Sequence, residues 1–599
     1  MPRSAKRVVI LLTDLAILAV AFWLAVWLKS GAIKVGEPLV WSAAATVSIA
    51  AVIFGALGVY HSVVRYIGLR DAFAILVGIV GAAIAGAVTD DFFGSDVVSA
   101  PTAVIFVSFA AVLLGGARLV ARFLFNMVGD EGAQPLIIYG AGESGRTTCV
   151  ALGPSRRFRP VAFVDDKSAL HGTRIGGLKV HSPVELPKLL KRYPGSSVLL
   201  ALSASSRARR QEVLNSLAPL GVHVRSLPNL SEVLSGRARV DDIRELDTAD
   251  LLGRVPVAPV GSLFQACVRD KSVLVTGAGG SIGSEICRQV LNNGPKRLVL
   301  FEISELALYN LERELREKCD VEGLQVELVP LLGDAKRRDR VLLALQAFKV
   351  QTVYHAAAYK HVPIVEHNVV EGVQNNVFST WVTAEAAMEA GVETFVLVST
   401  DKAVNPTNVM GATKRVAELV LQGMQARSAG TRFAMVRFGN VLASSGSVVP
   451  LFQEQIRKGG PVTVTHPEVV RYFMTIPEAA QLVIQAGAMG QGGDVFVLDM
   501  GQPVRIVDLA RRMIRLSGRT LRDAANPQGD IEIRYTGLRP AEKLYEELLI
   551  GKNVSGTEHP MIMRAFEEHL PWSKLEPLLQ HLVEGVRAND CARLIELLR

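Results

Sequence analysis

Four long apolar runs near the amino terminus constrain the fold of this chain more than any other feature. They cover residues 8–28, 39–59, 72–88 and 100–116. In lipid a segment must satisfy its own backbone hydrogen bonds, and about 20 apolar residues cross the bilayer as a helix. A composition with 49% hydrophobic and only 20% charged residues agrees with this. The sequence therefore predicts an α-helical membrane segment of four spans over residues 1–125.

Basic residues predict the orientation of these spans. Lys and Arg precede the first run, lie between the second and third, and follow the fourth: Arg3, Lys6, Arg7, Arg65, Arg70, Arg118 and Arg122. The loop that contains Asp90, Asp91 and Asp96 has none, whereas Lys29 and Lys34 in the first loop are a weaker opposing signal. The positive-inside rule then places both termini and the rest of the chain on the cytoplasmic side of the inner membrane. A cleaved signal peptide is disfavoured because three further apolar runs follow the first.

Asp14 lies inside the first apolar run. An intramembrane acid suggests a function by default. The alternatives are a polar contact between helices and a position close to the interface. Because no basic residue inside the other runs offers a partner, we favour these alternatives.

A glycine-rich turn at residues 272–285, SVLVTGAGGSIGSE, predicts a dinucleotide site. A strand over 273–275 precedes Gly277, Gly280 and Gly283, and a helix follows, so backbone N–H groups can approach a pyrophosphate. Ser281 and Ile282 belong to the same turn. A second strand over 297–301 ends in Glu302, which can accept from a ribose hydroxyl and would repel a 2′-phosphate. The pattern favours NAD over NADP.

A second pattern of this kind lies upstream, in LIIYGAGESGR at 136–146. Gly140, Gly142 and Gly145 follow a strand, and a strand over 161–164 ends in Asp165 and Asp166. We therefore expect two tandem α/β Rossmann-type domains, at 126–227 and 269–599, joined by a linker over 228–268. No proton-transfer cluster follows the strands of the first domain, so a regulatory or structural nucleotide site and a domain that binds nothing both remain open.

Polar residues follow the apolar strand predicted at 395–398, namely Ser399, Thr400, Asp401 and Lys402. A helix then begins near Met410 and carries Lys414 one turn later. Chemistry in open α/β sheets usually takes place at the carboxyl ends of the strands. A plain surface loop is the alternative.

Six ordered motifs make a resemblance specific. They are TGAGGSIGSE, GDAKRRD, HAAAYKHVP, STDKAVNPTNVMGATK, RFGNVL and GLRPAEKLYEEL. Together they resemble the membrane-bound nucleotide-sugar 4,6-dehydratases, the polysaccharide-biosynthesis branch of the extended short-chain dehydrogenase/reductase superfamily. The resemblance implies an NAD-dependent lyase with a small carboxy-terminal substrate-binding part. Its substrate would be a UDP-sugar, with UDP-N-acetylglucosamine as the first choice, and its product would feed surface glycan or glycoprotein synthesis.

The resemblance also suggests partners. Besides the lipid bilayer and the UDP-sugar, we expect a homo-oligomer and contacts with other glycan-biosynthesis enzymes. The net charge of +8 could indicate nucleic acid, but no Lys/Arg block with interleaved aromatic residues occurs, so nucleic acid is not expected. The five cysteines are scattered without C-x-x-C spacing, and no metal is expected.

Met410 departs from the superfamily pattern Tyr-x-x-x-Lys, since methionine cannot carry a proton. The chain resembles the large, C5-retaining dehydratases in having methionine there. Thr400, polarised by Lys414 or through a water, is then the candidate to deprotonate the sugar 4-hydroxyl. We assign Asp401 as the acid for the 6-hydroxyl and Lys402 as the base for C5. Both roles need pKa values shifted by burial, and a plain Asp401–Lys402 ion pair is the alternative.

Further site residues follow from the resemblance. Asp334 is expected at the adenine, although a helix N-cap is its alternative. Asn376 is expected to support the active-site edge of the sheet. The remaining candidates for the cofactor are Ala356, Ala357, Ala358, Lys360 and Lys414, and those for the substrate are Lys360, His361, Met410, Asn440, Val441, Ser447, Arg471, Arg539 and Lys543. Arg437 and Glu547 are interpreted as solvated surface charges, and Ala541 stands where glycine is expected.

Two rival functions remain. A nucleotide-sugar 4-epimerase on the same fold would rely on the missing tyrosine and would not need Asp401 and Lys402. A non-catalytic membrane sensor of nucleotides would have no use for these two residues or for Lys414.

Overall fold

The computed structural model describes residues 3–31, 37–57, 59, 69–93, 99–128, 133–152, 157–202, 207–227, 243–246, 250, 257–428, 430–442, 444, 446–548, 553–567 and 569–599. It divides into two compact units. The first comprises Met1–Gln134 with Pro154–Arg159, and the second comprises Pro135–Gly153 with Pro160–Arg599. Much of the predicted linker, at 228–242, 247–249 and 251–256, lies outside the described residues.

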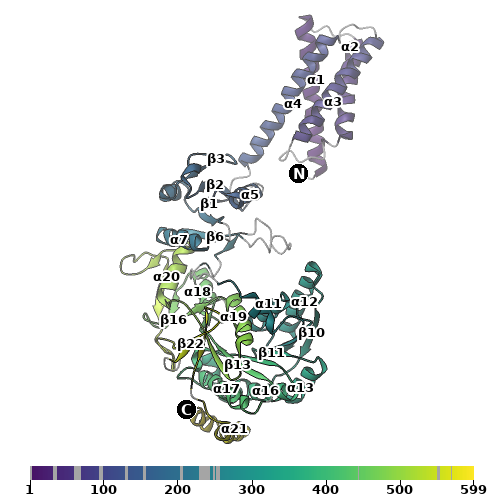
Figure 1. Ribbon diagram of the computed structural model, residues 1–599. Coiled ribbons are helices and arrows are strands. Elements are labelled where there is room, and N and C mark those ends of the chain that lie inside the picture. The colour runs from purple at the N-terminus through teal and green to yellow at the C-terminus, as the bar shows by residue number, and fades with distance from the viewer. Residues whose placement is uncertain are drawn as a thin grey trace. The chain divides into compact units, whose positions relative to one another are not determined.

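The first unit contains four long helices (Figure 1), namely α1 (Arg3–Ser30), α2 (Glu37–Ala56), α3 (Leu69–Phe93) and α4 (Ala100–Val128). All four are long and apolar enough to cross a membrane, as the sequence predicts. Helix α2 packs against α3, and α1 packs against α4. The orientation prediction rests in part on Arg65 and Asp96, which lie outside the described residues.

Asp14 on α1 has a partner that the sequence reading missed. The guanidinium of Arg118 on α4 donates to both of its carboxylate oxygens, at 3.1 Å and 2.7 Å. Helix α4 continues beyond the apolar run that ends at residue 116, and this extension brings Arg118 against α1. The expectation that Asp14 has no basic partner is therefore wrong. A charge in an apolar helix bundle is stabilised by such pairing, so the pair links the first helix to the last.

The first α/β sheet of the second unit has the strand order β3-β4-β2-β1-β5-β6-β7. Its strands are β1 (Gln134–Tyr139), β2 (Phe158–Val164), β3 (Arg174–Ile175), β4 (Leu178–His181), β5 (Ser197–Leu200), β6 (His223–Ser226) and β7 (Arg244–Glu245). Its helices include α5 (Glu143–Leu152), α6 (Leu186–Arg192) and α7 (Arg207–Leu217). Strand β1 runs parallel to β5, and β5 parallel to β6, so the predicted Rossmann-type arrangement is present.

The second sheet has nine strands in the order β10-β9-β8-β11-β12-β13-β18-β23-β22. The seven from β10 to β18 are parallel, and β23 and β22 add an antiparallel edge. These strands are β8 (Ser272–Thr276), β9 (Arg297–Glu302), β10 (Glu327–Leu332), β11 (Thr352–His355), β12 (Thr394–Val398), β13 (Arg432–Arg437), β18 (Asp494–Leu498), β22 (Val554–Gly556) and β23 (Ile562–Ala565). Chain order reverses between β8 and β11, which opens a crevice at their carboxyl ends.

Helices cover both faces of this sheet, and each face has its own hydrophobic core (Figure 1). One face packs against α13 (Arg338–Ala347), α16 (Ser379–Glu389), α17 (Val409–Gln425), α21 (Trp572–Arg587) and α22 (Cys591–Leu598). The other packs against α10 (Gly261–Ala266), α11 (Ser281–Leu291), α12 (Glu305–Glu322) and α19 (Ile476–Met489). Sheets covered on both faces are built from nearly continuous apolar strands, which is why the sequence revealed them.

The segments after β13 build a small part beside the carboxyl ends of the strands. Its strands are β14 (Asn440–Val441), β15 (Val462–Val464), β16 (Val470–Arg471), β17 (Phe473–Met474), β19 (Val504–Arg505), β20 (Leu521–Arg522) and β21 (Ile531–Tyr535). Helices α18 (Val448–Arg457) and α20 (Ile506–Leu516) pack on them. Strand β14 pairs with β17, and β16 with β19.

Arg437, at the end of β13, corrects the prediction of a solvated surface charge. Its side chain is fully buried, and it forms ion pairs with the equally buried carboxylates of Glu418 on α17 and Glu567 after β23. Arg415 on α17 contacts both carboxylates as well, and the Ser399 hydroxyl donates to Glu418. Burial raises the pKa of Glu418, but the charges and hydrogen bonds of Arg437, Arg415 and Ser399 together outweigh burial and lower the pKa. The network ties α17, β13 and the carboxy-terminal segment together.

We expect Arg437→Met to destabilise the protein by about 3–5 kcal/mol, because it removes the buried guanidinium that Glu418 and Glu567 share. Arg593→Met serves as the control, since Arg593 forms an exposed pair with Glu584 and its loss should change stability by less than about 0.5 kcal/mol. Chemical denaturation of the detergent-solubilised chain measures both. Equal effects from the two variants would contradict the structural importance of the network.

Candidate functional site

The glycine-rich turn between β8 and α11 has the geometry that a dinucleotide requires. Gly277 adopts φ +62°, and a Cβ at this position would lie 2.8 Å from the backbone of Ala357. A Cβ on Gly283 would lie 2.1 Å from the carbonyl oxygen of Gly277. Gly280 is the N-cap of α11, so no side chain covers the start of this helix from the cap position. Only glycine permits these close approaches, so the backbone packs tightly at the start of α11.

Glu302 ends β9 beside this turn. One carboxylate oxygen accepts from the N–H of Gly279 at 2.8 Å, and the other accepts from Ile303 and Ser304. The acid therefore holds the glycine-rich turn against the end of β9. Asp334 accepts from the N–H of Lys336, whereas the N-cap of α13 is Arg337. The helix N-cap alternative for Asp334 is therefore wrong.

Asn376 fixes the segment that follows β11. Its side-chain amide accepts from the N–H of Tyr359 at 2.8 Å and donates to the carbonyl of the same residue at 3.0 Å. It also donates to the hydroxyl of Thr413 on α17. Residues 356–358 lie between β11 and this clamp, so small side chains line the crevice at that point. Asn376 thus ties α17 to the segment after β11, in which Lys360 and His361 follow Tyr359.

Lys414 is buried on α17, and its ammonium donates to the carbonyl oxygen of Val398 at the end of β12, at 2.8 Å. Burial lowers the pKa of Lys414 to about 8, although the carboxylate of Glu418 opposes the shift. Met410, one turn earlier, is buried in the core below the site. No titratable group therefore occupies the place of the usual tyrosine.

Thr400, Asp401 and Lys402 follow β12 and form one hydrogen-bonded group. The Thr400 hydroxyl and the Lys402 ammonium both donate to Oδ1 of Asp401, at 2.9 Å and 3.0 Å. Asp401 Oδ2 is buried without a hydrogen-bond partner among the described residues. It lies close to Gly439, where a Cβ would approach it to 3.1 Å. The structure thus joins Thr400 to Asp401, whereas the sequence reading joined it to Lys414.

The ammonium of Lys402 also meets residues of the substrate-binding part. It lies 3.5 Å from the side-chain oxygen of Asn440 and 3.5 Å from Oε1 of Glu546. Glu546 in turn lies 3.7 Å from the guanidinium of Arg471. Sequence reasoning missed Glu546, although it lies in the quoted motif GLRPAEKLYEEL, three residues after the selected Lys543. The three glutamates near Arg539 and Lys543 in this motif were the signal that could have indicated an acidic site residue.

The other substrate candidates lie around this group with differing contacts. Val441 is buried in β14, and Ser447 is the N-cap of α18 with its hydroxyl buried and without a partner among the described residues. His361 packs against Gly446. Lys543 donates to the carbonyl of Val404 and pairs with Glu547. These contacts place the loop after β12 against the carboxy-terminal segment.

Arg539 and Ala541, in the motif at 537–548, differ from the expectations of the sequence in exposure and in backbone conformation. Arg539 is exposed, and its backbone N–H donates to Glu542. Ala541 adopts φ +61°, the left-handed region that favours glycine. The alanine that replaces the expected glycine therefore adopts a strained backbone conformation.

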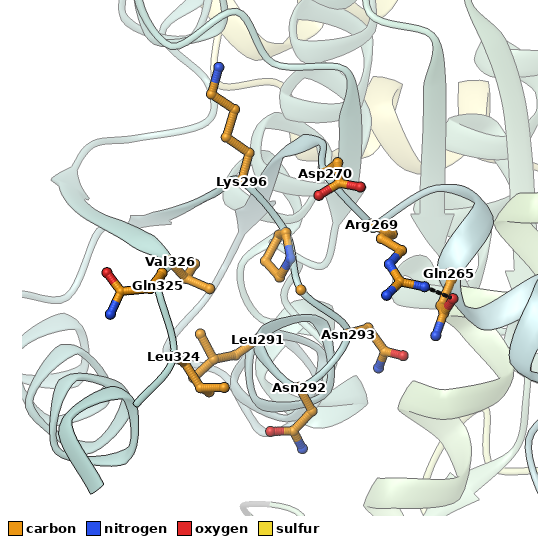
Figure 2. Close-up of a pocket in the computed structure, with 12 residues that line it drawn as sticks. Gln265, Arg269, Asp270, Leu291, Asn292, Asn293, Lys296, Leu324, Gln325 and Val326 are labelled. Carbon is orange, nitrogen blue, oxygen red and sulfur yellow. Dashed lines mark hydrogen bonds between the residues drawn. The ribbon is translucent and has the colours of Figure 1, made fainter. Parts of the chain in front are cut away.

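A pocket of about 570 Å³ lies elsewhere in the second unit, and Figure 2 shows its lining. Its residues come immediately before β8, β9 and β10, at the amino ends of the strands. The guanidinium of Arg269 is held there by Gln265 at 2.9 Å. Since the crevice and the proton-transfer groups lie at the carboxyl ends, this pocket is not the candidate site.

Known proteins resemble this chain over most of its length. The family model described as polysaccharide biosynthesis protein matches residues 273–567. The capsular polysaccharide biosynthesis protein CapD of Staphylococcus aureus is 43% identical over 481 residues, which are 79% of this chain and 79% of CapD. The probable polysaccharide biosynthesis protein EpsC of Bacillus subtilis is 40% identical over 531 residues, 85% and 86% of the two chains. A UDP-glucose 4-epimerase of Rickettsia rickettsii is 32% identical over 288 residues, 48% of this chain and 80% of the epimerase.

The depressed pKa of Lys414 leads to a stability prediction. The folded state loses this proton near pH 8 and the unfolded state near 10.5, so stability contributed by this group rises as pH climbs between these values. We expect Lys414→Met to be more stable than the wild type at pH 7 by about 1–3 kcal/mol. The difference should vanish towards pH 10.5.

Thermal unfolding across this pH range measures the effect. Lys458→Met is the control, because Lys458 is an exposed lysine on the surface. A Lys414→Met variant that is less stable at pH 7, or a difference that does not change with pH, would contradict the buried ammonium.

Proposed function

Since the chain belongs to the polysaccharide biosynthesis protein family, whose relatives it matches over most of its length, we propose that it is a membrane-anchored, NAD-dependent UDP-sugar 4,6-dehydratase. The substrate we propose is UDP-N-acetylglucosamine, converted with loss of water to a UDP-4-keto-6-deoxy sugar whose C5 configuration is retained. The observation that carries the proposal is the Asp401–Lys402 pair at the carboxyl end of β12. It supplies an acid and a base side by side next to a dinucleotide crevice.

The residues of the crevice fit NAD. The turn from Gly277 to Gly283 leaves room for a pyrophosphate at the start of α11, and Glu302 suits an unphosphorylated ribose. Lys414 would hold the nicotinamide ribose, with Ala356, Ala357 and Ala358 beside the ring. NAD, when bound, supplies a reversible hydride acceptor between C4 and C6 of the sugar, so that no external reductant is consumed.

Asp401 and Lys402 would perform the elimination. In the structure they form an ion pair at 3.0 Å, which was the alternative reading of the sequence. The required acid and base differ from this pair by one proton, moved from Nζ of Lys402 to the carboxyl group of Asp401. Burial by itself favours the neutral pair, but the carboxylates of Asp401 and Glu546 together outweigh it and keep Lys402 protonated, so the neutral pair we propose to react is the minor form. Lys402 can then take the C5 proton, while Asp401 protonates the departing 6-hydroxyl through its unpartnered Oδ2.

Thr400 remains our proposal for the group that meets the 4-hydroxyl. Its hydroxyl donates to Asp401 and its oxygen accepts from the N–H of Lys402, which leaves one lone pair for a hydrogen bond from the sugar. Because an isolated threonine is far too weak an acid to act as a base, the proton must pass to a neighbouring group. Asp401 already carries a proton in the form that performs the elimination, so the acceptor we propose is the neutral amine of Lys414, reached directly or through a water, as the sequence suggests.

The remaining proposals concern the surroundings of the enzyme. Substrate diphosphate would meet Arg471, Arg539 and Lys543, with Asn440 and Ser447 as neutral donors. The four apolar helices would anchor the chain in the inner membrane with both termini in the cytoplasm. A homo-oligomer and other glycan-biosynthesis enzymes are the proposed protein partners.

A 4-epimerase is the second candidate, because the relative from Rickettsia rickettsii carries that name. An epimerase returns hydride to C4 and leaves the C5 proton untouched. The buried methionine at position 410 and the acid–base pair after β12 favour the dehydratase. A nucleotide sensor would release its ligand unchanged.

Proton NMR of the detergent-solubilised chain tests these functions. Mixed with UDP-N-acetylglucosamine in D2O without added cofactor, the wild type should form a C6 methyl group next to a deuterated C5. A product altered only at C4 would establish the epimerase, and unchanged substrate even with added NAD would overturn the proposed reaction.

Two substitutions assign the roles. We expect Lys402→Met to slow turnover by about 10²–10⁴-fold, because it removes the base for C5. Lys458→Met, an exposed lysine, should leave the rate unchanged. A Lys402→Met enzyme with the rate of the wild type would remove Lys402 from the mechanism.

A further inference from the structure

Charges of alternating sign form a chain through the candidate site. Asp401 pairs with Lys402, Lys402 with Glu546, Glu546 with Arg471, and Arg471 with Glu542. The contacts measure 3.0, 3.5, 3.7 and 3.2 Å in this order. Nothing in the proposed mechanism uses Glu546. Yet it lies between the residue proposed as the base and the cation proposed for the diphosphate.

Glu546 comes from a part of the chain far from its partners. Lys402 follows β12 and Arg471 ends β16, whereas Glu546 lies in the segment between β21 and β22. Its side chain is 7% exposed, that of Arg471 10% and that of Lys402 20%. Because little water separates these groups, their charges interact more strongly than on an open surface.

The groups that face Lys402 determine its protonation. Burial by itself lowers the pKa of Lys402, but the carboxylate of Asp401 and then that of Glu546 outweigh burial and raise it, while Arg471 acts in the opposite direction. Asn440, on β14, is the neutral neighbour. Glu546 is therefore the one carboxylate that contacts Lys402, among the described residues, from outside its own loop.

We propose that Glu546 is a positioning residue, which holds the proton on Lys402 and couples this lysine to Arg471. The inference rests on the proposed dehydratase function. The negative charge of Glu546 stabilises the fully protonated pair, in which Asp401 is a carboxylic acid and Lys402 an ammonium. Lys402 in this form cannot accept the C5 proton. Glu546 thus helps to set the pH at which the base becomes available, and its contact with Arg471 links this pH to the substrate-binding part.

The pH dependence of kcat/KM for dehydration tests the role. In Glu546→Gln the acid limb of kcat/KM should move to lower pH by about one unit. At a pH on that limb, kcat/KM as a fraction of the variant's own maximum should then be about tenfold higher than the same fraction for the wild type. A purely structural residue would lower the maximum without moving the limb. The matched control is Glu547→Gln, the adjacent carboxylate, which is exposed and pairs with Lys543 and Asn405. Its acid limb should coincide with that of the wild type.

Glu546→Asp provides a second variant should the glutamine form fail to fold. Because aspartate is one methylene shorter, its carboxylate keeps the charge but lies farther from Lys402. The acid limb should therefore move to lower pH, by less than in Glu546→Gln. Wild-type turnover combined with an unmoved limb in the folded variants would overturn the role of Glu546 and leave the dehydratase intact. A wild type that does not turn over the UDP-sugar would overturn both.

Discussion

The buried ion pairs of Arg437 are the interaction on which the site depends. Arg437 ends β13, Glu418 lies one turn beyond Lys414 on α17, and Glu567 follows the edge strand β23. Three segments that are distant in sequence are thereby held at one place, and Ser399 at the end of β12 joins them through Glu418. A buried pair that loses one partner is strongly destabilising, so the position of Lys414 is fixed by charges that take no part in the reaction.

Opposed charges also shape the site itself. Burial lowers the pKa of Lys414 to about 8, whereas the carboxylates of Asp401 and Glu546 raise the pKa of Lys402 and keep it charged. Two lysines placed within the same crevice thus have pKa values displaced in opposite directions. Such separation of neighbouring titratable groups is how one site can contain different acid and base roles. It also explains why residues outside the catalytic strand, such as Glu546, bear on the chemistry.

Local patterns in the sequence predicted the fold well because each has a local cause. Apolar strands buried on both faces, glycines at the turn after β8 and four apolar helices are all visible as runs or spacings. Arg437 was mistaken for a surface charge, and Asp14 was left without its partner Arg118, because ion pairing across the fold leaves no periodic signal. Glu546 was missed for the same reason, since only the folded chain brings residue 546 to residue 402.

The two α/β domains show why a fold alone does not predict chemistry. Asp165 and Glu302 both end a strand and accept a hydrogen bond from the N–H of a glycine-rich turn, at 2.6 Å and 2.8 Å. In the first domain the next acid, Asp166, is occupied by Tyr139 and Arg209. Strand β12 of the second domain is followed by two hydroxyl residues, an acid and an amine, whereas β6, at the corresponding place in the first sheet, is followed in sequence by LPNL. The same turn therefore recurs without the groups that move protons, and chemistry resides in the residues grafted onto one of the two sheets.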